Sequence, residues 1–518
     1  MDQIQLSHVE HILALSEQLP GDWAKMGSFD PYQEGDDAYR YQLAYMAYML
    51  ALVQHHYVPA YRERYQKAFI SLIDKMLRQD VWAYWENTSR GGRAMDPDLP
   101  SLTDGWVDPV CRQNIMYSGH LLMMIGLYEM LYRDGRYDQP GSINFRFRPI
   151  FRGMGPEEFA YNHTSLANAI YDEFKRQNFL GCECEPNGIF VFCNQFPILG
   201  FMHYDATHGT DLSVSVIKGF SKAWGSRTNL FEGGSSNLPV YYLVRQNRFV
   251  DELEIEGSES ASGLAWGTFM HAWKREFTER MYPGARDNAI QRHSNGGISV
   301  EMKKSAESHD DYQKNPSTDK VDPMMLGVHT LGMAAVCASE MGDEETTDGI
   351  YAYAEEHLKP TTVNGRRFFP RCDELVSEKY MTCLTGNVLL GLARLKVHNG
   401  FWSLYNKPFT PETFSRPELF EIPHPTIQVT EACWDVDGHL KVSTNGSSAA
   451  GGVSISVHHL DACTTCVEID GNSEFIKKLT TTIQGFEFTW DDSNSGVLRI
   501  RGDFVGQRSF TFLNKAKP

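Results

Sequence analysis

The stretch Tyr39–His56, which reads YRYQLAYMAYMLALVQHH, decides the fold. Its pattern is helical, and apolar residues occupy most sides of that helix. A helix that is apolar nearly all round has to be covered by protein on all sides, whereas a surface helix shows one apolar stripe. Residues 39–56 are therefore predicted to form an inner helix, around which other helices pack.

Further helices of two kinds follow outward from this one. Residues 113–132 are again almost entirely apolar, and other segments show helical patterns separated by loops rich in Gly, Pro, Asp and Asn: 5–18, 161–178, 212–223, 260–280, 324–341, 345–358 and 383–398. Very apolar helices alternating with amphipathic ones indicate an inner and an outer layer. The pattern predicts an (α/α) barrel of helical hairpins, but no regular repeat gives their number.

The composition changes near residue 420. From residue 426 to 512 apolar and polar residues alternate with a period of two, and Asp437-Gly438 and Asp470-Gly471 are hairpin turn signals. We therefore predict a mainly α protein with a catalytic domain over residues 1–420. A small antiparallel, β-sandwich-like domain is predicted over residues 421–518.

Charge and hydropathy exclude several classes of partner. The 518 residues include 66 acidic and 48 basic ones, a net charge of −18, and no basic stripe is visible. Nucleic acid is therefore not expected as a partner. No run of 18 apolar residues predicts a transmembrane helix, and the first 20 residues lack the pattern of a signal peptide. We expect a cytoplasmic protein with reduced thiols, compatible with a homo-oligomer.

Motifs for cofactors and metals are missing. The sequence contains no glycine-rich phosphate loop, no dinucleotide fingerprint, no HExxH motif and no paired CxxC spacing. Asp36-Asp37 lacks the further carboxylates that a magnesium–diphosphate site needs. We therefore expect no cofactor and no metal, and chemistry carried out by side chains alone.

Three cysteines lie in the stretch Gly181–Gln195, GCECEPNGIFVFCNQ. Pro186 and Gly188 indicate a turn, and Ile189 to Cys193 reads as a buried strand or a short extended segment. Cys184 and Cys193 flank this unit and can converge on one site. A thiol can act as a nucleophile, an acid or a base. The alternative is that both are buried core residues, as free cysteines usually are.

Two helices offer further acid–base groups. Met116 and His120 are four residues apart, which places them on one face of the apolar helix 113–132. Tyr41 and Tyr45 likewise share a face with Tyr48 on the helix 39–56. Either set can be core packing with satisfied polar atoms. The functional alternative is the wall of a pocket whose side chains donate and accept protons.

Three motifs together resemble the linalool dehydratase-isomerase family. They are YRYQLAYMAY from Tyr39, NIMYSGH ending at His120, and CEPNGIFVFCNQ from Cys184. The resemblance covers roughly residues 20–400. It implies an (α/α)6 barrel with a central apolar pocket, in which cofactor-free acid–base chemistry acts on a terpene alcohol. Two features depart from the family pattern: this chain lacks a secretion signal, and it has a long segment, residues 134–160, between His120 and the cysteines.

The resemblance also implies site residues. Cys184, Cys193 and His120 match catalytic positions, and Met116 and Phe190 match pocket positions. The family's early Asp and Tyr are not placed uniquely, with Asp30, Asp36 or Asp37 and Tyr41, Tyr45 or Tyr57 as candidates. Our predicted catalytic residues are Cys184, Cys193, His120, Asp36, Asp37 and Tyr45. Our predicted substrate-binding residues are Met116, Phe190, Tyr41, Tyr57, Glu185 and Trp266.

Three functions remain open from the sequence. The first is a terpenoid dehydratase, isomerase or cyclase acting on a small apolar terpenoid or a prenylated substrate. The second is a polysaccharide lyase or glycoside hydrolase, by analogy of fold only, which needs paired carboxylates or a Tyr/His/Arg set in a polar cleft. The third is a non-catalytic protein that binds an apolar ligand, for which the Cys/His/Asp set would be dispensable.

Overall fold

The structure is a computed structural model. It describes residues 1–28, 30–35, 37–228, 230–231, 238–252, 261–300, 330–371, 382–461, 465–469, 472–476, 480–491 and 496–514. Asp36, one of the predicted catalytic residues, lies outside this described part, as do residues 324–329 at the start of one predicted helix.

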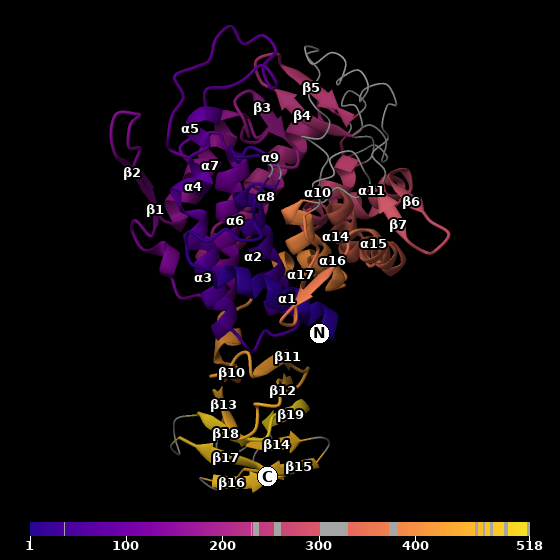
Figure 1. Ribbon diagram of the computed structural model, residues 1–518. Helices are drawn as coiled ribbons and strands as arrows, with labels where there is room; N and C mark the ends of the chain where they lie inside the picture. The colour runs from indigo at the N-terminus through magenta and orange to yellow at the C-terminus, as the bar shows by residue number, and fades with distance from the viewer. Residues whose placement is uncertain are drawn as a thin grey trace. The chain divides into compact units, whose positions relative to one another are not determined.

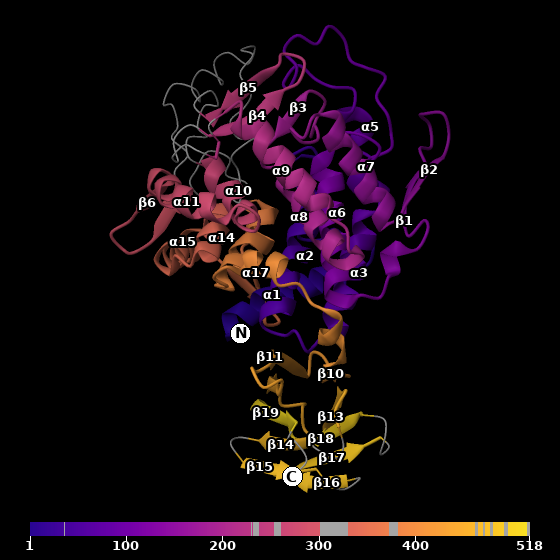
Figure 2. The same ribbon diagram turned by 180° about the vertical axis from the view of Figure 1, so that it is seen from behind.

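The chain is mostly helical, with separate antiparallel sheets (Figures 1 and 2). The α-helices are α1 (Gln3–Ser16), α2 (Tyr39–His56), α3 (Glu63–Met76), α4 (Gln79–Trp82), α5 (Trp85–Thr88), α6 (Ile115–Tyr132), α7 (His163–Arg176), α8 (Gln195–His208), α9 (Leu212–Gly225), α10 (Ala261–His271), α11 (Arg275–Ala289), α14 (Thr330–Met341), α15 (Glu344–His357), α16 (Leu390–Arg394) and α17 (Gly400–Asn406). A π-helix, η3 (Thr385–Leu389), leads into α16, and 3-10 turns form η1 (Arg136–Asp138) and η4 (Pro411–Ser415).

The most apolar helices lie in the interior, as predicted. Every residue of α6 is buried, and α6 packs against α7 and α8, while α9 lies against α8 (Figures 1 and 2). Gly119 permits the close approach of α6 and α8, because a Cβ at this position would lie 2.8 Å from Cδ of Pro197. The sequence patterns did not predict α8. Pro197 and Gly200 lie in its first half, and both residues usually signal a loop.

Two other helical predictions need correction. The pattern over residues 260–280 predicted one helix, but α10 ends at His271 and α11 begins at Arg275, with Lys274 in a non-helical conformation between them. The pattern over residues 383–398 contains the π-helix η3 before α16 begins. The (α/α)6 barrel remains a prediction.

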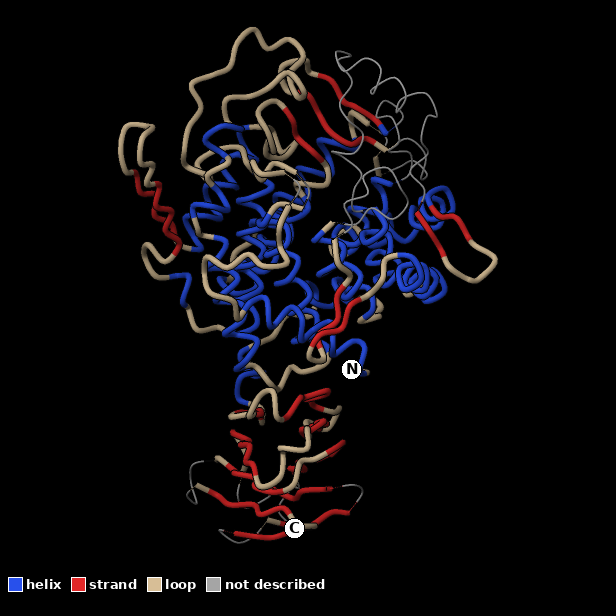
Figure 3. The backbone as a smooth tube through the Cα atoms, viewed as in Figure 1, coloured by secondary structure: helices blue, strands red, loops and turns tan. Residues whose placement is uncertain are grey.

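Strands form small sheets in the helical part and two larger sheets near the C-terminus (Figure 3). β1 (Ile143–Phe147) pairs with β2 (Glu157–Tyr161), so part of the predicted long segment 134–160 is a hairpin. The other small sheets are β3 (Gly188–Phe190) with β4 (Pro239–Leu243) and β5 (Arg248–Asp251), β6 (Ile290–Arg292) with β7 (Ile298–Val300), and β8 (Thr361–Val363) with β9 (Arg366–Phe368).

The predicted period-two region consists of antiparallel strands. One sheet has the order β10-β13-β18-β17-β16, and the other has the order β11-β12-β19-β14-β15. The strands are β10 (Glu418–Phe420), β11 (Ile427–Trp434), β12 (Leu440–Gly446), β13 (Val453–His458), β14 (Thr465–Ile469), β15 (Asn472–Phe475), β16 (Thr480–Ile483), β17 (Phe486–Trp490), β18 (Leu498–Gly502) and β19 (Gly506–Asn514). The rings of Phe486 and Phe510, one from each sheet, meet edge to face at 5.1 Å.

Contacts divide the chain into two compact units. One consists of residues 1–6, 50–68 and 409–518, and the other of residues 7–49 and 69–408. The predicted domain division at residue 420 stays a prediction. Within the described part of the chain, no helix combines the length and the apolar character that a membrane crossing requires.

Candidate active site

The first turn of α6 is fastened to the cysteine segment by backbone hydrogen bonds. The N–H of Asn114 donates to the carbonyl of Cys184 at 3.1 Å, and the N–H of Ile115 donates to the carbonyl of Glu183 at 3.2 Å. The first N–H groups of a helix have no partner within the helix. The segment that carries Cys184 supplies partners for two N–H groups at the start of α6. The position of Cys184 relative to the helix of His120 is thereby fixed.

The cysteine segment is mostly turns. Strand β3 is limited to Gly188–Phe190, so the predicted strand up to Cys193 is too long. Beyond the strand, the side chain of Asn194 links two parts of the segment. Its Oδ1 accepts from the N–H of Cys182 at 2.7 Å, and its Nδ2 donates to the carbonyl of Phe190 at 2.8 Å. Gly181, with a φ of +122°, leaves room for this clamp, because a Cβ there would lie 2.6 Å from Asn194 atoms.

The turns bring the thiols of Cys184 and Cys193 together. The two thiols share a hydrogen bond, and Cys184 also hydrogen-bonds with the carboxyl group of half-buried Glu185. Both cysteines are buried and neither forms a disulfide. Burial raises the pKa of Cys184 well above its usual value, and the hydrogen bond with Cys193 raises it further. Cys184 is therefore a neutral thiol, able to donate a proton.

A buried arginine lies beside this thiol. Nη2 of Arg40 donates to the hydroxyl of Tyr41 at 3.0 Å, and its guanidinium lies over the rings of Tyr41 and Tyr84, at 4.3 and 4.1 Å. Burial raises the pKa of Tyr41 well above its usual value, whereas Arg40 lowers it and Cys184 raises it. Arg40 also donates to the backbone carbonyls of Gln33 and Glu34. The cation thus anchors the loop before α2.

His120 faces the same group of tyrosines from α6. Its Nδ1 lies 2.6 Å from the hydroxyl of Tyr48, while its Nε2 is buried without a hydrogen-bond partner. Its ring meets that of Tyr41 edge to face at 5.6 Å, so Tyr41 connects the thiol site with the imidazole. Burial lowers the pKa of His120 well below its usual value, and Arg40 acts in the same direction. The imidazole is therefore neutral.

Aromatic rings surround the imidazole. Phe196 of α8 stacks on His120 with ring centroids 3.8 Å apart, and Phe269 of α10 lies 4.9 Å from Phe196. Tyr45 completes the group, 5.9 Å from His120 and 5.8 Å from Phe269, and its hydroxyl contacts Sδ of Met333 at 3.8 Å. Faces of aromatic rings and thioether sulfur are soft, electron-rich groups that stabilise a cation without trapping it as an anion would.

Two of the predicted carboxylates, Asp30 and Asp37, have hydrogen-bond partners in the loop before α2. Buried Asp37 accepts from the hydroxyl of Ser28 at 2.5 Å, and its backbone carbonyl accepts from Gln42. Asp30 accepts from the backbone N–H groups of Tyr32 and Gly35, which is a turn role.

The predicted substrate-binding residues are spread over several places. Buried Met116 lies on α6 one turn before His120, and Phe190 at the end of β3 contacts the ring of Tyr241 at 4.9 Å. Trp266 of α10 stacks against Phe277 rather than on the ring of His120. Tyr57 belongs to the other compact unit, where its hydroxyl accepts from Gln5 at 3.4 Å.

Several residues of this site were not among the predicted site residues. They are Arg40, Phe196 and Phe269, together with Tyr48, which the helical spacing had placed on one face with Tyr41 and Tyr45. Arg40 carried a signal, because a cation inside an otherwise apolar helix is rarely buried without a reason. Phe196 could not be recognised as a site residue, because its helix, α8, was not predicted. Phe269 is one of several apolar residues of α10, and only packing distinguishes it from Trp266.

A neutral thiol paired with a second cysteine, a neutral imidazole and a wall of aromatic rings give this site groups that can donate and accept protons in apolar surroundings. The family comparison agrees with a site of this kind. The model of the linalool dehydratase/isomerase family matches residues 40–375, and the chain belongs to this family. The resemblance of its three motifs to that family is thereby confirmed.

Solved structures are similar only at a distance. An inactive variant of an α-1,6-mannanase of Salegentibacter sp., in complex with α-1,6-mannotriose, is 8% identical, with 76% of this chain and 100% of that chain covered and a TM-score of 0.41. An endoglucanase from Clostridium thermocellum, complexed with cellotetraose, is 9% identical, with 99% and 93% covered and a TM-score of 0.34. At these TM-scores neither likeness bears on the function of this chain.

Proposed function

We propose that the protein is a cofactor-independent terpenoid lyase or isomerase, in an (α/α)6 barrel, that works by acid–base catalysis on an apolar isoprenoid alcohol. The observation that carries the proposal is the hydrogen-bonded pair of Cys184 and Cys193 beside Tyr41, which in turn contacts His120. Membership of the linalool dehydratase/isomerase family supports the same reaction class.

The reaction begins with protonation of the substrate hydroxyl. The acid is a thiol of the Cys184–Cys193 pair, whose proton can be replaced along the hydrogen bond to Glu185. The C–O bond then breaks, both of its electrons leave with oxygen, and water is released. A positioned general acid contributes about 10²- to 10⁴-fold to the rate.

The resulting allylic cation lies against aromatic rings. Phe196, Phe269 and Tyr45 offer ring faces, and each such contact stabilises a desolvated cation by about 2 kcal/mol. Dispersed stabilisation of this kind leaves the cation reactive. Loss of a proton gives an alkene, and return of water at another carbon gives an isomeric alcohol. Attack by an internal alkene closes a ring and moves the positive charge to another carbon, which then loses a proton or takes up water.

The base that removes the proton is His120. Its Nε2 is buried without a partner. The Tyr48 hydroxyl can donate to Nδ1 or accept from it, so both neutral tautomers of the ring are available. In the tautomer with the proton on Nδ1, Nε2 presents a lone pair. Burial keeps the pKa of His120 low, so the proton is not retained and can pass back to the thiol pair.

The proposal is tested by incubating the protein, with no metal added, with alcohols from monoterpenes to diterpenes and with prenylated aromatics. Product mass analysis with retention times separates the reactions. Loss of one water indicates dehydration, with or without ring closure, and unchanged mass at a new retention time indicates isomerisation or ring closure with return of water. Ligand binding without any product, unchanged when Cys184 or Cys193 is replaced, would instead identify a non-catalytic binding protein. Turnover of an oligosaccharide in the same assay would identify a carbohydrate-active enzyme.

A further inference from the structure

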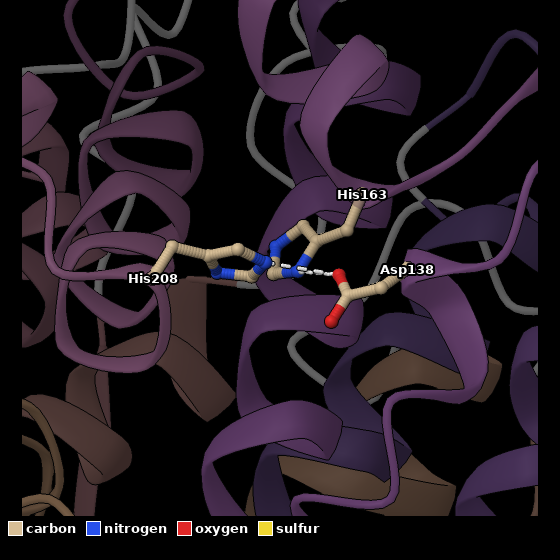
Figure 4. Close-up of side chains that lie close together, drawn as sticks. All are labelled: Asp138, His163 and His208. Carbon is tan, nitrogen blue, oxygen red and sulfur yellow. Dashed lines mark hydrogen bonds and ion pairs between the residues drawn. The ribbon is translucent and has the colours of Figure 1, made fainter.

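A second group of chemically active side chains lies apart from the cysteine site. Asp138 ends η1, His163 begins α7 and His208 ends α8. Figure 4 shows the three side chains pointing toward one another. One oxygen or nitrogen atom from each lies within 4.8 Å of the other two. We propose that these three residues bind a divalent transition-metal ion, with Zn²⁺ as the best fit.

The hydrogen bonding of His208 supports a cation between these side chains. Its Nδ1 lies 3.2 Å from the backbone carbonyl oxygen of Tyr204, which can only accept, and 2.9 Å from the hydroxyl of Thr207. That hydroxyl also lies within hydrogen-bond distance of the carbonyls of His203 and Tyr204. When the Thr207 proton goes to one of these carbonyls, Nδ1 faces only acceptors and carries a proton. In the neutral ring, Nε2 then presents a lone pair, and this atom lies 2.9 Å from Oδ1 of Asp138. Two acceptors that face each other require a proton or a metal ion. A histidine whose other ring nitrogen donates to a carbonyl is the usual arrangement at a zinc site.

His163 provides the independent second observation. Its side chain is fully buried, and neither ring nitrogen has a hydrogen-bond partner. Nδ1 lies 3.9 Å from Oδ1 of Asp138. A buried polar atom without a partner is costly, and a shared metal ion removes that cost at Nδ1 of His163. A proton shared by Asp138 and His208 alone does not.

The surroundings suit a metal ion with one open coordination position. Two histidines and one carboxylate are a common ligand set for Zn²⁺, with water as the fourth ligand. Asp138 and His208 are 39% and 20% exposed, which gives an ion and its water access from solvent. His208 lies at the C-terminal end of α8, where the helix dipole favours positive charge.

The three ligands come from separate segments of the helical part. The ion would join η1 to the start of α7 and the end of α8. Asp138 comes from the long segment that departs from the family pattern. The second group with metal-ligand spacing in the described residues, Asp435, Asp437 and His439, differs because Oδ1 of Asp435 already accepts from two backbone N–H groups. It carries no proposal.

The test is zinc binding by the full chain, in a Cys111→Ser background because Cys111 is an exposed free thiol. Protein stripped with a chelator is titrated with Zn²⁺ against a chromophoric zinc indicator. One tight equivalent per chain is expected, and Co²⁺ should give the visible spectrum of a tetrahedral site with nitrogen and oxygen ligands. Losing one ligand should weaken binding at least as much as losing an outer-shell partner, which costs about 10- to 100-fold.

The ligand variants are His208→Gln and Asp138→Asn, both at partly exposed positions, and the matched control is His439→Gln. Circular dichroism checks that each variant is folded. The proposal is overturned if the folded parent chain binds no Zn²⁺ above the level of His208→Gln, or if both ligand variants bind like the control. In either case Asp138 and His208 form an ion pair only.

Discussion

The hydroxyl of Tyr48 on α2 lies 2.6 Å from Nδ1 of His120 on α6, and their rings are stacked with centroids 5.9 Å apart. The Tyr48 hydroxyl can donate to Nδ1 or accept from it, so this contact is compatible with both neutral tautomers of His120. Nε2 has no hydrogen-bond partner. Its basicity can therefore be changed, without replacing His120, by removing the Tyr48 hydroxyl from Nδ1 on the other side of the ring.

Replacing His120 should lower turnover more than replacing Tyr48. His120→Gln removes the base and should cost about 10²- to 10⁴-fold. Tyr48→Phe removes only the hydroxyl and should cost less, with the substrate KM little changed. The control is Tyr117→Phe on α6, the helix of His120. This variant loses a hydrogen bond to the carbonyl of Met76 and should lose stability but not turnover. Equal activity of His120→Gln and the parent would remove His120 from the mechanism.

The thiol pair gives the sharpest prediction about the chemistry. Cys184→Ala and Cys193→Ala should each lower turnover by about two to four orders of magnitude, because each removes one end of the proton-donating pair. Folding should change little, since one sulfur atom is lost. Cys182→Ala is the matched control: it is buried in the same segment, but its thiol donates to the carbonyl of Ile170 at 3.6 Å. Near-full activity of both test variants, measured by product formation, would show that these cysteines only pack.

Arg40 should act as a positioning residue. Arg40→Met removes the donors to the carbonyls of Gln33 and Glu34 and the cation over Tyr41. Each of these carbonyls loses a hydrogen bond from a charged donor, and such a bond contributes about 1.5–3 kcal/mol. For Arg40→Met we expect a lower melting temperature and lower turnover. Arg40→Lys restores the positive charge but cannot donate to the carbonyls of Gln33 and Glu34 in the same geometry. A turnover that Arg40→Lys restores fully would show that only the charge matters. Arg280→Met, which removes an exposed donor to one carbonyl, is the control.

Stability should fall when the pH drops below about 6.5, the pKa of histidine in an unfolded chain. Burial lowers the pKa of His8 to about 3 and that of His11 to about 4. Between these values and 6.5 the unfolded chain binds protons that the folded chain does not, so the stability contributed above pH 6.5 is lost on acidification. Urea unfolding at pH 7 and pH 5 should differ by about 1–2 kcal/mol for each histidine. A double variant, His8→Gln with His11→Gln, should show a smaller difference, and an unchanged difference would contradict this origin.

Chelator treatment should leave the chemistry intact. Neither group with metal-ligand spacing in the described residues includes Cys184, Cys193 or His120. Turnover at room temperature should therefore survive removal of metal, while the melting temperature should drop if Asp138, His163 and His208 hold zinc. Loss of turnover that is restored by Zn²⁺ or Mg²⁺, in protein shown to be folded by circular dichroism, would contradict metal-independent catalysis.

Residue patterns determined much of the architecture. A helix that is apolar on most sides has to be an interior helix, so the helix 39–56 was predicted correctly, and the helix 113–132 was predicted correctly except that it begins at Ile115. A period of two after residue 426 indicated the antiparallel strands of that region, but β10 lies before it. These patterns are local consequences of which faces must be buried. The motif around Cys184 and Cys193 likewise indicated the family, because both cysteines belong to one short stretch of the sequence.

Which side chains meet became known only from the packing of the helices. The pairing of Tyr48 with His120, the stacking of Phe196 on that ring and the burial of Arg40 beside Cys184 each join segments far apart in sequence. The same holds for Asp138, His163 and His208, which no motif links. Such contacts depend on how helices pack, here on the close approach of α6 and α8 at Gly119. Periodicity shows that a face is buried, but it carries no information about the residue that lies opposite.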